Sequence, residues 1–186
     1  MKYNTLDIDT FIETEQVYLR PISLSDVNED YMGWLNDKEI TKGLMISNTT
    51  TTIESLREYV ESKIVDPEVY MYAIVDRQTD IHIGNIKFDK FDWVSSTCEL
   101  GILIGNKKFW RRGIASEVVR ATLVNIFENL NIRKVLLAVF SNNPAAIKLY
   151  SKIGFNQEGC LKDHILVESE YVDKYYMSLF KSEFVL

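Results

Sequence analysis

Hydrophobic and polar residues follow two different periods in the first part of the chain. The alternation around Val17–Ile22 predicts a β-strand that is ended by a proline. Ser25 is a suitable helix N-cap. Apolar residues then recur at helical spacing, at Val27, Tyr31, Trp34 and Leu35. A strand followed by an amphipathic helix is therefore expected in this segment.

A second helix and a β-hairpin are expected next. Thr51 and Glu54 have the spacing of a capping box, and the apolar positions behind them fit one face of a helix over 53–64. Residues 70–76 and 81–88 are rich in strand-forming residues, and the polar residues between them predict a hairpin. Another strand is predicted over 97–105.

Helices and strands alternate in the second half. An apolar stripe predicts a helix over 114–129, and the continuous apolar run Val135–Phe140 predicts a strand covered on both faces. Asn143-Pro144 begins a helix that ends near Gly154, and 171–180 reads as a last strand. The order predicts a mixed α/β fold with a central sheet, in one domain over 1–186 that includes an N-terminal extension over 1–16.

Composition and charge exclude several classes of protein. The 186 residues are 46% hydrophobic and 26% charged, which fits a globular domain. We expect no membrane association and a cytoplasmic location, because there is neither a long apolar run nor a basic, apolar leader. The formal charge of −6 disfavours binding to nucleic acid. Cys98, Cys160, His82 and His164 lack metal-ligand spacing, so no metal is expected.

A basic turn with a glycine joins the strand over 97–105 to the following helix. Free N–H groups in the first turn of a helix, together with its dipole, attract anions. Gly113 and Ala115 let a pyrophosphate approach the backbone, and Arg111 and Arg112 add positive charge. A plain strand-to-helix turn explains the same residues, since a glycine before a helix is common. The segment matches neither the Walker loop nor the GxGxxG pattern.

A second segment follows the apolar strand. Asn143 stands directly after that strand, and Tyr150 follows about two helical turns later. The phenol of Tyr150 can then point back to the strand end, although periodicity alone favours a core tyrosine.

Together, the two segments resemble the GNAT superfamily of N-acetyltransferases, over nearly the whole chain. Residues 111–115 resemble its acetyl-CoA pyrophosphate loop, and Asn143, Tyr150 and Gly154-Phe155 resemble its fourth motif. The resemblance implies a mostly antiparallel central sheet with flanking helices, whose strands 97–105 and 135–140 splay apart at the cofactor site. Trp110 departs from the family pattern, which usually has Gln or Arg there.

The resemblance also implies that acetyl-CoA is the acetyl donor. Ile102, Leu103 and Ile104 would offer strand edges to its pantetheine arm, and Asn143 would contact the same arm. The pyrophosphate would be held by Trp110, Arg111, Arg112, Gly113, Ile114, Ala115 and Ser116.

Acetyl transfer from a thioester to an amine needs a base, a donor to the oxyanion and an acid for the thiolate. By resemblance Tyr150 is the acid, since a phenol of pKa ~10 can donate to a thiolate of pKa ~8.5. A backbone N–H near Leu103 would polarise the carbonyl. Glu99 is the candidate base, and pairing with a lysine or arginine is an equally good reading of it. His164, on an expected loop, is a weaker candidate than Glu99, and His82 is expected to be structural.

The sequence constrains the identity of the acceptor amine less than any other part of the reaction. Residues 18–39 resemble the branch of ribosomal-protein, polyamine and amino-sugar acetyltransferases, and Trp34–Asp37 looks most like enzymes acting on nucleotide-linked amino sugars. Trp34 and Asp37 would then bind the substrate, although the helical face of Trp34 favours packing. A small-molecule amine is expected, with a polyamine, a protein N-terminus and a non-catalytic acyl-CoA sensor as alternatives. A homodimer is also considered.

Overall fold

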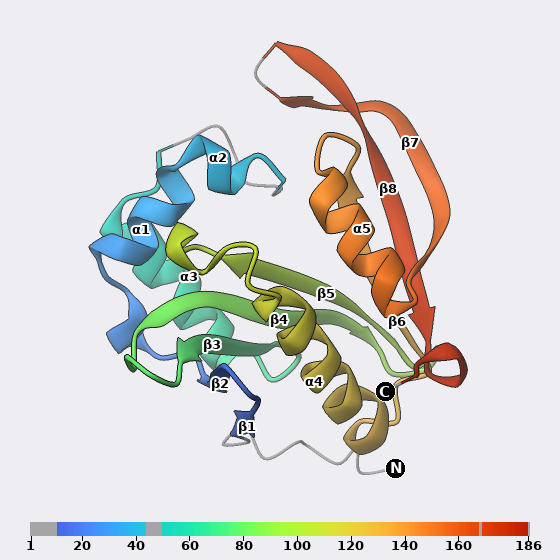
Figure 1. Cartoon of the computed structure of the whole chain (residues 1–186), viewed down its shortest axis with the longest axis horizontal. Helices are drawn as coiled ribbons and strands as arrows, with labels where there is room; N and C mark the ends of the chain where they lie inside the picture. The colour runs from blue at the N-terminus through green and yellow to red at the C-terminus, as the bar shows by residue number, and fades with distance from the viewer. Residues whose placement is uncertain (1–10, 44–49, 168, 186) are drawn as a thin grey trace.

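The computed structural model describes residues 11–43, 50–167 and 169–185. Its centre is an eight-stranded sheet in the order β1-β2-β3-β4-β5-β6-β8-β7 (Figure 1). The strands are β1 (Ile12–Glu13), β2 (Val17–Pro21), β3 (Tyr70–Asp76), β4 (His82–Asp92), β5 (Thr97–Ile104), β6 (Lys134–Phe140), β7 (Asn156–Val167) and β8 (Glu170–Phe180).

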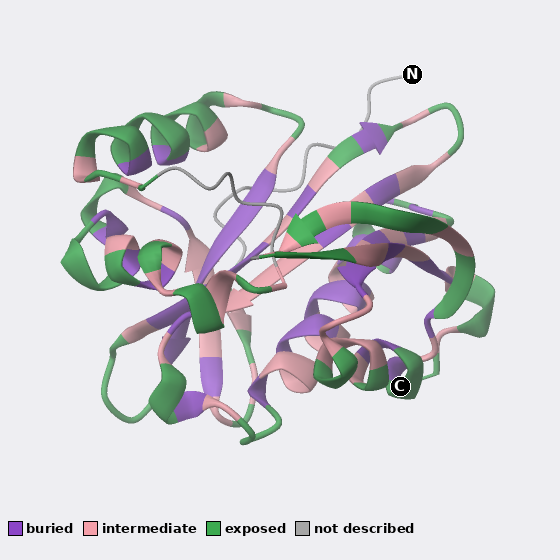
Figure 2. Ribbon diagram, turned by 90° about the horizontal axis from the view of Figure 1, so that it is seen from above, coloured by how far each residue is buried: buried purple, intermediate pink, exposed green. Residues whose placement is uncertain are grey.

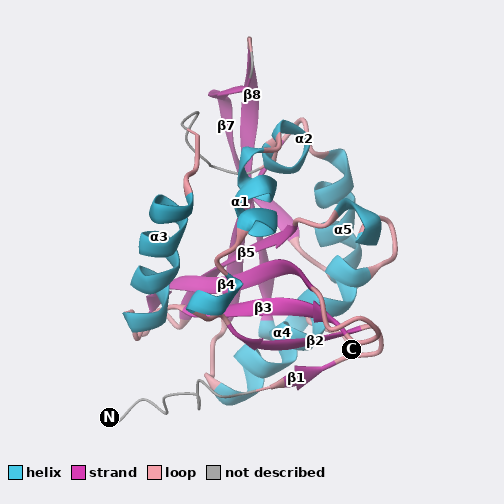
Figure 3. Ribbon diagram, turned by 90° about the vertical axis from the view of Figure 1, so that its left-hand side faces the viewer, coloured by secondary structure: helices cyan, strands magenta, loops and turns pink. Residues whose placement is uncertain are grey.

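Helices cover both faces of the sheet (Figure 3). They are α1 (Glu29–Asn36), α2 (Lys38–Thr41), α3 (Ile53–Val65), α4 (Ile114–Asn129) and α5 (Pro144–Ile153), with 3-10 turns at η1 (Leu24–Asp26), η2 (Lys107–Phe109) and η3 (Lys181–Glu183). The buried faces of α4 and α5 pack on one side of the sheet, and α1 and α3 pack on the other.

Burial explains why these residues form a layered structure. All seven residues of β3 are buried, because both faces of this strand are covered by helices. Helix α4 buries a stripe that includes Val118, Leu123 and Ile126 against the sheet, while α1 and α3 bury Trp34 and Leu56 on the opposite face. Purple strands therefore fill the middle of Figure 2, and much of β7 is green.

The mixed, mostly antiparallel sheet with flanking helices confirms the expected fold class. Neighbouring strands are antiparallel throughout, apart from the parallel pair of β5 and β6. A parallel pair needs a crossover connection, and the 3-10 turn and α4 supply it. This single parallel pair is where the functional residues gather.

Two helix caps lie later in the chain than the sequence suggested. Asn28, rather than Ser25, caps α1, with its side-chain oxygen accepting the N–H of Tyr31 at 2.9 Å. Ser25 lies inside the short turn η1. Thr52, rather than Thr51, caps α3, and its hydroxyl accepts the N–H of Ser55 at 3.2 Å. Several neighbouring polar residues can cap a helix, so spacing alone leaves the choice open.

Two strands were not expected from the sequence. The short β1 pairs with β2, where Phe11 stacks on Tyr18 at a centroid distance of 4.8 Å. Of the extension over 1–16, residues 1–10 lie outside the described part. The long β7 pairs with β8 and carries His164, which was expected on a loop. Its residues are exposed on both faces over most of its length, so it shows no alternation of polar and apolar positions.

Candidate active site

The parallel strands β5 and β6 pair at only one end. Their register runs from Thr97 opposite Lys134 to Glu99 opposite Leu136, and both strands continue beyond that point without pairing. The predicted splay is therefore confirmed. A cavity of about 540 Å³ occupies the opening. It is lined by β5, the turn before α4, β6 and α5, with Ile40 and Gly43 from the α2 segment.

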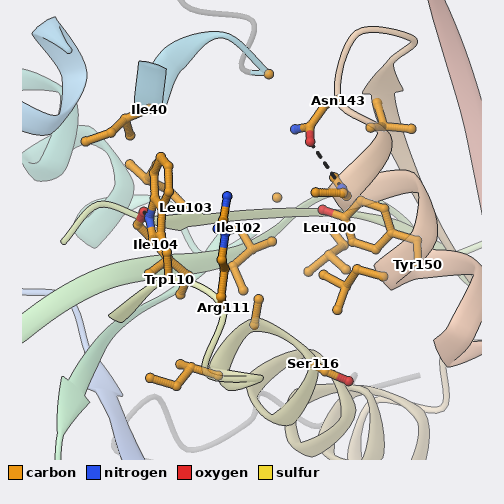
Figure 4. Close-up of a pocket in the computed structure, with 18 of the residues that line it drawn as sticks. Ile40, Leu100, Ile102, Leu103, Ile104, Trp110, Arg111, Ser116, Asn143 and Tyr150 are labelled. Carbon is orange, nitrogen blue, oxygen red and sulfur yellow. Dashed lines mark hydrogen bonds between the residues drawn. The ribbon is translucent and has the colours of Figure 1, made fainter. Parts of the chain in front are cut away.

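Most residues expected to bind the donor line this one cavity, and Figure 4 shows the labelled ones around it. Arg112 is the exception among them, since its guanidinium lies over the ring of Phe109 at 4.9 Å. Tyr150 also lines the cavity, whereas Glu99, Trp34 and Asp37 do not. The residues brought together are Ile102, Leu103, Ile104, Trp110, Arg111, Gly113, Ile114, Ala115, Ser116, Asn143 and Tyr150.

The turn before α4 exposes a row of backbone N–H groups. Arg111 and Gly113 both have left-handed backbone conformations, with φ of 62° and 81°. The first bonds of α4 run from the N–H groups of Ser116 and Glu117 to the carbonyl of Gly113, at 3.0 and 3.1 Å. Within the described residues, none of the five N–H groups from residue 111 to residue 115 donates a hydrogen bond. With the helix dipole and the Arg111 side chain, which points into the cavity in Figure 4, they suit a phosphate anion.

Trp110 joins this turn to the end of β5. Its indole N–H donates to the carbonyl of Ile104 at 2.8 Å, and its ring forms one wall of the cavity. The ammonium of Lys107 lies over the same ring at 5.9 Å. The tryptophan therefore ties the cavity wall to the end of β5 through a backbone contact.

Tyr150 is a buried phenol whose hydroxyl faces the cavity (Figure 4). The hydroxyl has no hydrogen bond to any other described residue. Burial raises the pKa of Tyr150 to about 12. The ring packs edge-on against Phe155, with the centroids 5.7 Å apart. Such a group stays protonated at neutral pH and is free to donate its proton to a ligand.

Asn143 sits at the N-terminus of α5. Its side-chain oxygen caps the helix by accepting the N–H of Ala146 at 3.1 Å, and its side-chain nitrogen lies against Gly43. A Cβ on Gly43 would be 2.3 Å from that nitrogen, so a larger residue there would displace the Asn143 side chain. Sequence reasoning missed Gly43 and Ile40, because nothing local connects them to a strand more than ninety residues later.

Strand alternation fixes which backbone groups of β5 face the opening. The carbonyl of Leu103 points at Gly84 on β4, whereas the carbonyl of Ile104 points to Trp110 in the cavity wall. The N–H and C=O of one residue in such a strand point to the same side and alternate along it. The N–H of Ile102, next to Leu103, therefore faces the opening.

Glu99 lies on the other face of β5, at the last paired position before the splay. Its carboxylate accepts from the ammonium of Lys90 at 2.7 Å, and this bond raises the pKa of Lys90. On β4, Asp89 stands directly opposite Glu99 and pairs with Lys87, which covers Gly101. Two further residues of β8 lie on this face, and we call the six residues the charged cluster: Lys87, Asp89, Lys90, Glu99, Lys174 and Tyr176.

The residues expected to bind the acceptor have structural roles. Trp34 is 8% exposed and packs on Gly105, where an added Cβ would be 2.0 Å from its ring. Asp37 caps α2 and pairs with Lys107 at 2.7 Å, and this contact lowers the pKa of Asp37. Neither side chain lines the donor cavity. The indole is needed to fill the space above Gly105.

The histidines and cysteines supply no further site. As expected, His82 is structural, with its Nε2 near the carbonyl of Gly84 at 2.9 Å and the side-chain oxygen of Asn85 at 3.0 Å. Cys98 is buried, which raises the pKa of its thiol, and Cys160 lies on β7. Within the described ranges, no three His, Cys, Asp or Glu residues are grouped as a metal site, and no helix is long and apolar enough to cross a membrane.

Comparison with known proteins agrees with this geometry. The family model for the acetyltransferase (GNAT) domain matches residues 16–156. An uncharacterized N-acetyltransferase, p20 of Bacillus licheniformis, is 28% identical over 92% of this chain and 96% of its own length.

Solved structures show the same fold. Spermidine N-acetyltransferase from Vibrio cholerae, in complex with CoA and spermine, has a TM-score of 0.83 at 24% identity, over 91% of this chain and 98% of its own. RimL, a ribosomal alpha-N-protein acetyltransferase in complex with coenzyme A, has a TM-score of 0.81 at 19% identity, over 92% and 98%. Since the family model covers most of the sequence, the chain belongs to the GNAT family of acetyltransferases.

Proposed function

We propose that this acetyltransferase passes the acetyl group of acetyl-CoA directly to a primary amine in a ternary complex, and that the amine belongs to a small molecule such as a nucleotide-linked amino sugar. The observation that carries the mechanism is the fork between β5 and β6. A phenol faces it from α5, and a carboxylate lies at its base on the opposite face of the sheet. Two reactants can therefore meet from opposite sides.

The residues of the cavity fit the parts of acetyl-CoA. Free N–H groups from residue 111 to residue 115 and the side chain of Arg111 suit the pyrophosphate, as oriented backbone donors at a helix N-terminus do. The unpaired edge of β5 and the apolar walls from Ile104 and Ala146 suit the pantetheine arm. Acetyl-CoA supplies an acyl thioester, so this chain needs no nucleophile of its own.

Three groups of the chain meet the needs of acyl transfer. The N–H of Ile102 donates to the carbonyl oxygen as negative charge develops there. Glu99 takes a proton from the attacking amine, directly or through water. The hydroxyl of Tyr150 donates its proton to the sulfur as the carbon–sulfur bond breaks. Because its pKa is about 12, the proton moves only when charge builds up on sulfur.

Direct attack is supported by where the thiols lie. Cys98 is buried in the core, and Cys160 stands on β7, so neither lines the cavity. A covalent acyl-enzyme on sulfur has no residue to form it among those lining the cavity.

Charges near the fork support a small acceptor that is not a polyamine. Asp89 and Glu99 are the two carboxylates of the charged cluster, and each already pairs with a lysine of β4. A polyamine can bind these two carboxylates only after it displaces the ammonium groups of the two lysines. Polyamine acetylation remains the second candidate, because the similar Vibrio cholerae structure contains spermine.

Dimerisation is part of the proposal. The hairpin of β7 and β8 extends beyond the rest of the sheet (Figure 1), and three of its large apolar side chains are exposed: Leu161, Leu166 and Tyr171. Contact with a second copy would cover them. Light scattering during size-exclusion chromatography tests this, and a monomeric mass contradicts it.

The enzymatic test is thiol release from acetyl-CoA in the presence of single amines. The panel holds amino-sugar nucleotides, the same amino sugars without nucleotide, spermidine, aminoglycosides and short peptides with free N-termini. Turnover confined to the amino-sugar nucleotides supports the proposed acceptor. Preferred turnover of spermidine or of a peptide refutes that acceptor while the acetyl transfer stands.

A further inference from the structure

Lys174 is a buried lysine without a counter-charge. Only 7% of the residue is exposed, yet within the described residues its ammonium makes neither an ion pair nor a hydrogen bond. Its one recorded contact is the face of the Tyr176 ring, 4.9 Å away. Asp173 beside it on β8 pairs instead with Lys162 at 2.6 Å. Buried charges are usually paired, so this ammonium is suited to bind an anion from outside the chain.

Lys174 lies one step along the sheet from the donor cavity. On β8, Tyr176 stands opposite Ala138 of β6, and Ala138 lines the cavity. Lys174 stands opposite Phe140, two residues farther along the same strand. Since same-face neighbours on a strand are two residues apart, the Lys174 row is about 7 Å from the Ala138 row.

The charged cluster connects Lys174 to the expected base. The ring of Tyr176 lies beneath the Lys174 ammonium and close enough to Lys90 to act on its charge. Lys90 in turn binds Glu99. Within the cluster, Lys87 and Lys90 are each matched by a carboxylate, so Lys174 carries the unmatched positive charge.

We propose that Lys174, over the ring of Tyr176, binds a phosphoryl oxygen of the acceptor and thereby selects amines that carry a phosphate several bonds away from the reacting nitrogen. This inference rests on the proposed N-acetyl transfer and deepens it by assigning a specificity residue. The nitrogen lies at the fork beside Glu99, and the phosphoryl group lies over β8.

The spacing argues for a phosphate at a distance and against an α-carboxylate. In an α-amino acid the amine and the carboxylate share one carbon, too close to span two rows of the sheet. The row of Glu99 continues through Leu136 to Ser178, four residues or about 13 Å from Lys174 along β8. An amino sugar joined to a nucleoside diphosphate, together with the long Lys174 side chain, is long enough to connect the two rows. The unmatched cation also opposes a polyammonium acceptor, since like charges repel.

The first experiment compares steady-state kinetics of four forms: wild type, Lys174→Met, Lys174→Arg and the control Lys148→Met. Met keeps the apolar stem of Lys174, and Lys148 is an exposed lysine on α5 outside the cavity lining. Lys174→Met should raise the KM for an amino-sugar nucleotide by roughly 10- to 100-fold, as loss of a charge-assisted hydrogen bond does. The KM for acetyl-CoA should not change, and Arg should restore much of the loss.

The same amino sugar without its nucleotide distinguishes recognition from general damage. For the wild type, the KM of this shorter acceptor should be higher than that of the amino-sugar nucleotide. Lys174→Met should have the same KM for the shorter acceptor as the wild type. An equal loss on both acceptors, or a Lys174-dependent preference for an α-amino acid, overturns the inference and leaves acetyl transfer standing.

A binding measurement decides the matter if no amine in the panel is acetylated. The probe is UDP, titrated calorimetrically into protein already saturated with CoA, so that the pyrophosphate turn is occupied. Binding to the wild type and to Lys148→Met, weakened at least tenfold in Lys174→Met, supports the phosphoryl site even though the proposed acceptor has failed. Absence of binding, or equal binding to all forms, refutes it.

Discussion

Replacing Tyr150 with Phe removes one hydroxyl and leaves the packing intact. The hydroxyl has no partner among the described residues, and the ring keeps its edge-on contact with Phe155, 5.7 Å between centroids. Loss of a hydroxyl without a protein partner should change the free energy of unfolding by less than about 1 kcal/mol. The variant is therefore expected to fold, to bind acetyl-CoA as the wild type does, and to fail in the chemical step.

The expected decrease in kcat follows from the role of the phenol as a general acid. General acid catalysis contributes about 10²- to 10⁴-fold to a rate. At 1.36 kcal/mol for each factor of ten, Tyr150→Phe should lose about 3 to 5 kcal/mol of transition-state stabilisation. The thiolate then departs without a proton, and kcat should fall by that factor while the KM for acetyl-CoA stays constant.

Thiol release monitored from pH 6 to pH 10 is the assay, with Tyr72→Phe as the matched control. Tyr72 is also buried with a pKa of about 12, yet it lies in β3 and does not line the cavity. Because burial holds the pKa of Tyr150 near 12, the wild type keeps its proton donor over this whole range and should show no alkaline loss from it. An unchanged kcat in Tyr150→Phe, or an equal loss in the control, would falsify this role.

Three further predictions concern other parts of the fold. Glu99→Gln should lower kcat/KM for the amine by about 100-fold; a kcat/KM equal to that of the wild type shows that another group is the base. Gly105→Ala puts a Cβ 2.0 Å from the Trp34 ring and should cost about 1 to 3 kcal/mol of stability; calorimetry with an unshifted Tm contradicts this. Burial lowers the pKa of His82 despite the opposing charge of Asp26, so the unfolded chain binds the proton more tightly. Stability should accordingly fall as the pH drops below about 6.5, and urea midpoints in His82→Gln should fall less over the same range.

Much of the fold follows from local pattern. The helix over 114–129 and the apolar strand at its end carry enough periodicity to be recognised alone, and the structure has α4 at Ile114–Asn129 and β6 at Lys134–Phe140. The strand β7 carries no such pattern, because it leaves the body of the protein and is exposed on both faces. A strand with neither face buried has no alternation of polar and apolar residues from which it could be predicted.

The residues proposed for the donor are mostly contiguous in sequence, and those proposed for the acceptor are not. A strand, a turn with glycine and a helix are consecutive in sequence, so residues 111–116 show themselves as one motif. Lys174, Lys90 and Glu99 come from three strands and meet only through the register of the sheet. The packing of Trp34 over Gly105 could not be predicted for a related reason, since an aromatic residue that fills such a space and one that binds a substrate look the same in sequence.

This difference has a consequence for how the acceptor is selected. Successive residues of β8 face opposite sides, so Met177 and Leu179 build the core while Lys174 and Tyr176 face the charged side. Substitution at every second position of this strand can therefore change the acceptor without creating a cavity in the core. In the proposed site the donor is held mainly by backbone N–H groups, which such substitutions leave in place. Acceptor preference and donor binding are thus separable in this fold, and variants of Lys174 should change the first while the affinity for acetyl-CoA stays constant.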